Sequence, residues 1–415
     1  MDLLQKRNEN DPHGSITQKP KNARKWETVA LVLTIIALVQ QSHSGITPAL
    51  AEIAKAFPES GSTMMALLNT LPTLTSIPAT VLVGRTISKK VSHKRFLLLG
   101  MSLLFVGGVL GTVCKTLWQL FLVRAVFGVG LGVAVTSLTD LTLAVYTADR
   151  AKKQLALNAL SANFGSILFQ FLGGYLCMIG WQYTFLCYLI IAVPLIAIAV
   201  FLPAQAGQRP AADAVEEAKA ECVTRIPAMV VVKWCAISAL FFAAFYVYVN
   251  NMSAIIVNDG MGTTGDVAIV LSVFGLGGML GSYLYRRFVY RTNQAAFLIA
   301  LATCMLGYLC VWFAKTLLLL YVSAVAFGCG FGMFVPVLMF YGGTAAGKEH
   351  HSHMVSYLNI ANYAGGFCSV YIMSGLARLL NITVDRGHFL IALMIFFLLL
   401  IGMLYELISA KRKQV

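Results

Sequence analysis

The eighteen residues from Lys115 to Gly132 read KTLWQLFLVRAVFGVGLG, and the eighteen from Lys315 to Gly332 read KTLLLLYVSAVAFGCGFG. Eight positions of the two segments are identical at an offset of 200 residues. A second pair of segments lies at a similar offset, because GRTISKK starts at Gly84 and GSYLYRR starts at Gly281. The two registers predict that the chain contains a duplicated unit.

A third pair supports the duplication, because Lys25-Trp26 and Lys233-Trp234 each precede a long apolar run. If each copy holds six membrane spans, both copies have the same orientation in the bilayer. Two such halves are related by an axis along the membrane normal, an arrangement found in transporters that work by alternating access.

The composition places the chain in a membrane. Of its 415 residues, 58% are hydrophobic and 12% are charged, whereas soluble domains are typically 45–50% apolar and about 25% charged. The net charge of +14 does not indicate nucleic acid, because the basic residues lie in short segments between apolar runs, as membrane orientation requires.

Twelve apolar runs are long enough to span a bilayer, for which about 20 residues are needed. We expect an all-α membrane protein with two six-helix bundles, at 27–203 and 228–408. A basic cytoplasmic tail (1–26), a cytoplasmic linker (204–227) and a C-terminal tail (409–415) complete the chain. The predicted spans are 27–49, 62–84, 96–114, 118–140, 155–178, 182–203, 231–254, 266–285, 295–313, 317–340, 354–377 and 388–408.

The distribution of positive charge predicts the orientation. With the N-terminus inside, 25 of the 31 lysines and arginines lie on the inner side, as the preference of basic residues for cytoplasmic segments requires. We therefore expect a multi-pass protein of the plasma (inner) membrane with both termini in the cytoplasm, and a monomer.

The chain resembles the major facilitator superfamily in its twelve spans, its duplication and the loop after the second span. In this loop Gly84, Lys89, Lys94 and Arg95 fit the pattern of the family, and Ser88 replaces its aspartate. In the second copy Gly281 and Arg286 fit.

The resemblance implies that this loop forms a cytoplasmic latch between the halves when the outer side is open. It assigns Gly84, Ser88, Lys89, Gly281 and Arg286 to the latch. Asp140, at the cytoplasmic end of the fourth span, is the expected partner of Lys89. The alternative is that Asp140 is a solvated surface acid, since exposed ion pairs contribute little stability.

Polar side chains at membrane depth are costly, so each is a candidate for function. The first and seventh spans, which the resemblance predicts to line the cavity, carry two polar clusters at matching depths. Hydrogen bonding between helices, without contact to substrate, is the alternative for every member. The candidate substrate-binding residues are Gln40, Gln41, His43, Arg124, Tyr246, Tyr248, Asn250, Asn251 and Asn362.

Arg124 is the one charge well inside a predicted span. It would either bind an anion or hold backbone carbonyls. Because no carboxylate lies at mid-span, His43 is the candidate for proton coupling, since small shifts move a histidine across physiological pH. A neutral histidine and transport without protons are the alternatives.

The sequence therefore predicts a secondary active transporter of a small organic solute, anionic or polar and neutral, working by rocker-switch alternating access. A proton-coupled drug exporter is the main alternative. Against this alternative, the chain lacks the Gly-Pro pair that antiporters of the family often carry in the fifth span, because Phe169-Gln170 stands at that position. A channel or membrane enzyme is more remote. No catalytic dyad, nucleotide loop or metal motif is present in the sequence, so no enzyme activity, cofactor or metal is expected. The expected partners are the solute, the lipid bilayer and protons.

Overall fold

The computed structural model of the chain is α-helical and has no strand among the residues that the structure describes. Most of the predicted N-terminal tail and of the predicted linker lies outside these residues. The described residues are 23–87, 92–146, 148–203, 226–285, 287, 295–345, 347, 351–380 and 386–412.

The N-terminal half begins with a divided span in which α1, the 3₁₀ helix η1 and α2 follow one another. A capping box at Thr116 starts α5, because the Thr116 hydroxyl accepts from the backbone of Gln119 and the Gln119 side chain accepts from the backbone of Thr116. The elements are α1 (Ala23–Ala37), η1 (Leu38–Ala49), α2 (Leu50–Ala56), α3 (Ser62–Ile87), α4 (His93–Val109), η2 (Leu110–Val113), α5 (Leu117–Val145), α6 (Ala148–Cys177), η3 (Trp181–Ile191) and α7 (Ala192–Phe201).

The described residues of the C-terminal half form six long helices. Thr263 and Asp266 form a capping box at the start of α10. The elements are α9 (Ala228–Asn258), α10 (Thr264–Leu284), α11 (Ala295–Phe313), α12 (Leu317–Thr344), α13 (His351–Leu379) and α14 (Gly387–Arg412).

Several helices are longer than the apolar runs predict. Helix α6 begins at Ala148 rather than at 155, and α5 ends at Val145 rather than at 140. The apolar run measures only the part of a helix that lies in hydrocarbon, and the polar turns of residues 148–154 (ADRAKKQ) extend α6 beyond it. The five residues added to α5 (LTLAV) are mostly apolar, so the predicted end at 140 was too early.

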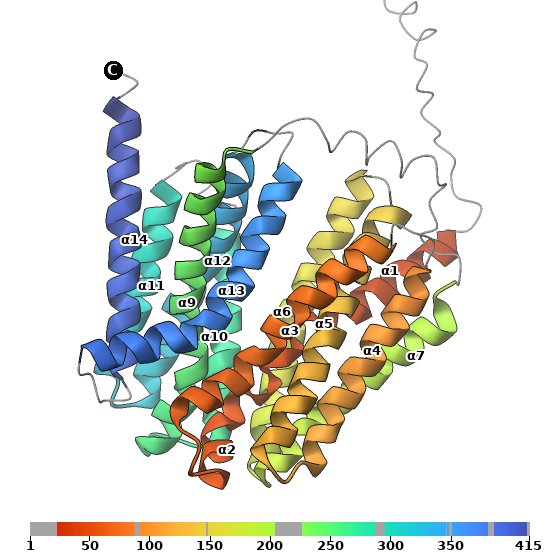
Figure 1. Ribbon diagram of the computed structural model, residues 1–415, viewed down its shortest axis with the longest axis horizontal. Coiled ribbons are helices and arrows are strands. Elements are labelled where there is room, and N and C mark those ends of the chain that lie inside the picture. Colours follow the sequence, from red (N-terminus) through yellow and green to blue (C-terminus); the bar gives the residue numbers. More distant parts are fainter. Residues whose placement is uncertain are drawn as a thin grey trace, which may run out of the picture.

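The helices form two bundles that lie side by side (Figure 1). Each bundle has its own apolar core. Buried Leu104, Phe127 and Phe185 belong to the core of the N-terminal half. The core of the C-terminal half is rich in aromatic rings, and those of Phe241 and Phe334 are stacked with their centroids 3.6 Å apart.

Eleven helical segments in the described part of the chain are long and apolar enough to cross a membrane. The remaining predicted span, 354–377, lies in helix α13, which has 29 residues. The predicted all-α membrane fold with two bundles is confirmed.

The two halves meet at one end of the molecule. Every hydrogen bond seen between described residues of different halves lies at the end where α2 is found, and the ribbons diverge toward the end where α14 terminates (Figure 1). The residues that form these bonds are Pro48, Ala51, Thr63, Asn69 and Gly174 in one half and Asn250, Ser253, Thr264 and Ser374 in the other.

Candidate functional site

Arg124 of α5 is fully buried, and its guanidinium donates to three backbone carbonyls. Nε lies 3.3 Å from the carbonyl oxygen of Leu68, and Nη2 lies 2.9 Å from that of His43 and 3.4 Å from that of Asn69. Two of these carbonyls belong to α3 and one to η1. The guanidinium therefore connects three segments of the N-terminal half.

Side chains complete the environment of Arg124. Nη1 donates to the hydroxyl of Tyr188 at 3.1 Å, and the guanidinium carbon lies 5.2 Å from the centre of the Phe127 ring. This arrangement is the carbonyl-bonded alternative that the sequence left open. In this conformation the guanidinium is enclosed by protein groups.

The polar cluster of the first span lies where the helix changes its winding. Gln41 departs from helical geometry with φ −109° and ψ 17°. The side chain of Gln41 is exposed, and those of Gln40 and His43 are half-buried. Nδ1 of His43 is buried and has no hydrogen-bond partner among the described residues. Both glutamines therefore present amide groups at mid-span.

Glycines of α6 allow η1 to approach closely. A Cβ at Gly165 would overlap the carbonyl oxygen of Leu38, and one at Gly173 would overlap that of Gly45. The role of both glycines is therefore close helix contact.

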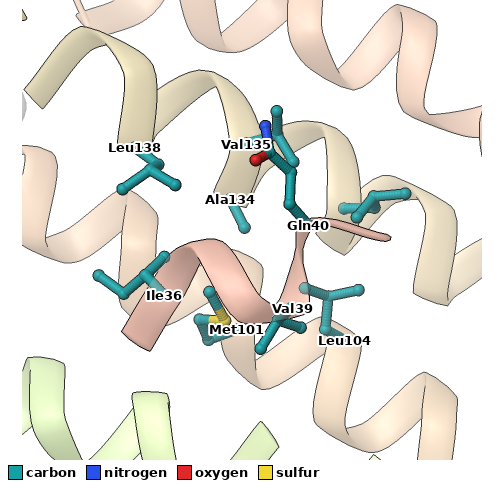
Figure 2. A pocket seen from close by; sticks show the side chains of 9 residues that line it. Ile36, Val39, Gln40, Met101, Leu104, Ala134, Val135 and Leu138 are labelled. Carbon is teal, nitrogen blue, oxygen red and sulfur yellow. The ribbon is translucent and has the colours of Figure 1, made fainter. Parts of the chain in front are cut away.

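A hollow of about 10 Å³ lies beside Gln40 (Figure 2). Its lining is apolar throughout, and Leu131 and Ala134 of α5 contribute to it. At the positions 200 residues later, the C-terminal half carries the rings of Phe331 and Phe334, which pack against Phe241. The two halves therefore differ here, because aromatic rings occupy the place of the smaller side chains.

The candidates of the seventh span point in different directions. Tyr248 was predicted to bind substrate, but its ring is fully buried in the C-terminal half and stacks on Phe327 at 4.5 Å. Its hydroxyl lies 3.3 Å from that of Ser323. In the observed conformation the side chain therefore faces the core of its own half, because depth along a helix does not fix the direction of a side chain, and its role in substrate binding stays a prediction. Tyr246 is buried with its ring against Gly366 of α13.

Asn250 and Asn251 lie at the contact between the halves. They line a cavity of about 30 Å³ together with Thr63 and Ala66 of α3, which is room for about one water molecule. Asn251 donates to the carbonyl of Val247 at 2.9 Å. Asn362 is half-buried in α13.

Sequence reasoning missed Asn69. This residue is 2% exposed in α3, and its Nδ2 donates to Oδ1 of Asn250 at 2.8 Å. An asparagine within the predicted span 62–84 is the same signal that identified the other candidates.

Half of the predicted latch lies outside the described residues, namely Ser88, Lys89 and Arg286. The predicted pair of Lys89 with Asp140 therefore stays a prediction. Gly84 lies in α3, and Asp140 is half-buried near the end of α5. Gly281 packs against the backbone of Cys329 in α12.

Comparison with known proteins gives consistent results. A family described as the Major Facilitator Superfamily matches residues 31–370. A protein described as a probable sugar efflux transporter, from Helicobacter acinonychis (strain Sheeba), is 27% identical over 253 residues. This match covers 60% of the chain and 62% of that relative, which is less than two thirds of its length.

Solved structures share the fold at low identity. A mutant of the nucleoside transporter NupG superposes with a TM-score of 0.72 at 13% identity, over 91% of this chain and 99% of that one. The xylose transporter XylE from E. coli, in an inward open conformation, gives 0.71 at 15% identity, over 91% and 95%.

Proposed function

The chain belongs to the major facilitator superfamily, and we propose that it is a secondary transporter that moves a small, polar, neutral solute by alternating access. The observation that supports alternating access is that the hydrogen bonds between described residues of the two halves all lie at one end. With both termini in the cytoplasm, as the charge distribution predicts, this end is extracellular and the conformation is inward-open. A rigid rotation of one bundle against the other would then expose the site to the opposite side.

The preference for a neutral solute follows from Arg124. Its positive charge was the reason to expect an anion, but the guanidinium is bonded to carbonyls of His43, Leu68 and Asn69. The exposed or half-buried polar groups nearby are the amides of Gln40 and Gln41. Amides both donate and accept hydrogen bonds, as hydroxyl-rich solutes require. The similarity to a probable sugar efflux transporter supports a sugar-like solute.

The test is transport by the purified full-length protein in liposomes. We expect counterflow of neutral hydroxylated solutes and none of organic anions or lipophilic cations. Transport of lipophilic cations alone would contradict the proposal and favour the drug-exporter alternative.

Two variants address the site directly. Gln40→Ala removes an amide, and Ala134→Val extends a side chain of α5 into the small hollow beside Gln40, so both should raise the KM for the transported solute. Gln119→Ala is the matched control, because Gln119 is exposed at the start of α5. An unchanged KM in both site variants would remove Gln40 and its hollow from the proposed site.

For energy coupling we propose His43 as the proton-carrying group. It lies in η1, and the described carboxylates Glu27, Glu52, Asp140, Asp266 and Glu406 lie near helix ends. His43→Ala should abolish uptake driven by a pH gradient while leaving exchange of solute at equal pH. Unchanged coupling in this variant would mean that transport does not use protons or that a group other than His43 carries them.

A further inference from the structure

Asn69 connects the interior of one half to the other half. Its Oδ1 accepts from the hydroxyl of Thr47 at 3.2 Å, and its Nδ2 donates to Oδ1 of Asn250 at 2.8 Å. All three side chains are buried. A buried amide whose donor or acceptor loses its partner is costly, so this position favours the state in which the halves are in contact.

Arg124 determines where Asn69 lies. The guanidinium is bonded to the carbonyl of Asn69 itself and to that of Leu68, and the same group holds the carbonyl of His43. Arginine suits this task because its five N–H donors have a fixed planar arrangement. The α3 segment that carries Asn69 and the η1 segment that carries the candidate site are therefore held by one side chain.

The other bonds across the contact involve small hydroxyl groups. Ser253 donates to the carbonyl of Pro48 at 2.7 Å and accepts from the backbone of Ala51 at 3.2 Å. The hydroxyls of Thr63 and Ser374 lie 3.1 Å apart. Among the described residues no ion pair crosses the contact. The halves can therefore separate at this end without leaving an unpaired charge in a region of low dielectric.

We propose that the Asn69–Asn250 hydrogen bond holds the two halves together at this end, and that Arg124 is the residue that positions this bond. We call this contact between the halves the gate and the Asn69–Asn250 bond its lock. The bond breaks when the halves separate, whereas the bonds of Arg124 lie within one half and persist. Because Arg124 also holds η1, a solute bound at Gln40 or Gln41 can influence the lock, since two sites that bias one equilibrium are coupled.

The test measures access to the gate and needs no substrate, so it is independent of the proposed solute. Ala66 lines the cavity beside Asn250, and Ala66→Cys serves as the reporter in the full-length protein. A membrane-impermeant thiol reagent is applied to each side of the membrane in turn, and labelling above that of the parent chain is counted. This design does not depend on the predicted orientation.

We expect Asn69→Ala and Asn250→Ala each to raise the labelling rate from the closed side by about three- to tenfold, the range that one hydrogen bond contributes. The double variant should label no faster than the faster single variant, because both changes break the same bond. Asn158→Ala is the matched control, since buried Asn158 bonds to Gln154 and Thr142 within its own half. It should leave the rate unchanged.

Arg124→Lys keeps the positive charge but loses the planar arrangement of N–H donors that the guanidinium provides. It should also speed labelling, and combining it with Asn69→Ala should add nothing to the effect of Asn69→Ala alone. A role in stability only would make the two effects additive. The proposal is overturned if Asn69→Ala labels as slowly as the parent, or if Asn158→Ala speeds labelling to the same extent.

Discussion

Arg124 shows how the burial of a positive charge inside a membrane protein is compensated. Arg124 has 0% exposure, and it donates to the carbonyls of Leu68, Asn69 and His43 and to the hydroxyl of Tyr188. Desolvation of an ion costs several kcal/mol unless hydrogen bonds compensate for it. Here the compensation comes from carbonyl dipoles, so the charge stabilises the contact between helices.

The first prediction concerns this residue. Arg124→Lys should lower the stability of the protein by about 3 kcal/mol, because an ammonium group cannot serve carbonyls on two sides and leaves buried acceptors unpaired. Tyr188→Phe removes only one partner and should cost about 1 kcal/mol. Thermal denaturation of the purified protein in detergent measures both.

The contradicting outcome is equally specific. If Arg124→Lys kept the parent melting temperature and lost binding of an organic anion, the guanidinium would be a substrate contact and the solute an anion.

For single residues, the sequence predicted the depth of a side chain in the membrane better than the direction in which the side chain points. The rule that polar groups at membrane depth are functional candidates placed Gln40, Gln41 and Asn250 near mid-span or at the contact of the halves. It did not indicate that Tyr248 faces the aromatic core. Helix α9 has apolar residues on all sides, so its sequence does not indicate which side faces the other half.

Single helices show where local sequence decides geometry. The first span was predicted as one helix over 27–49, but η1 winds more tightly and is irregular at Gln41. Pro48 has no backbone N–H to bond the carbonyl one turn earlier. A helix that departs from regular hydrogen bonding in a membrane needs other partners for its backbone, and Arg124 supplies one to His43. The proline was visible in the sequence, whereas the hydrogen bond from Arg124 to the His43 carbonyl was not.

The second prediction concerns helix packing. Gly281→Ala should lower stability by about 1–3 kcal/mol, because a Cβ there would overlap the carbonyl oxygen of Cys329 in α12 and force the helices apart. Gly402 of α14 has no atom within 4 Å of a Cβ placed on it. Gly402→Ala should be neutral or stabilising by up to about 1 kcal/mol, since alanine favours helix. Melting temperatures of the two variants in one detergent give the comparison, and equal values would show that Gly281 is not a packing contact.

The whole molecule repeats its contacts as well as its helices. Thr63 of α3 meets Ser374 of α13, and at positions about 200 residues away Thr264 of α10 donates to the carbonyl of Gly174 in α6 at 3.2 Å. The duplication was predicted from the sequence. Which end of the halves is in contact was not, because the proposed alternating access would require one sequence to form two arrangements.

The third prediction tests that relative motion of the halves. Thr63→Cys with Ser374→Cys places two thiols where the hydroxyls lie 3.1 Å apart across the contact, close enough for a disulfide after small adjustment. Oxidation should stop transport, because the halves can no longer separate at this end, and reduction should restore it. Radiolabelled solute uptake before oxidation, after oxidation and after reduction measures this.

Ser44→Cys with Ser166→Cys provides the matched control for that experiment. These hydroxyls lie 3.2 Å apart, and both belong to the N-terminal half. Their disulfide joins η1 to α6 within one bundle, so it should leave transport intact if each half moves as a rigid body. Loss of transport in the control alone would mean that the motion occurs inside a bundle. Transport through a fully oxidised Thr63–Ser374 pair would mean that this contact never opens, and alternating access at this seam would have to be abandoned.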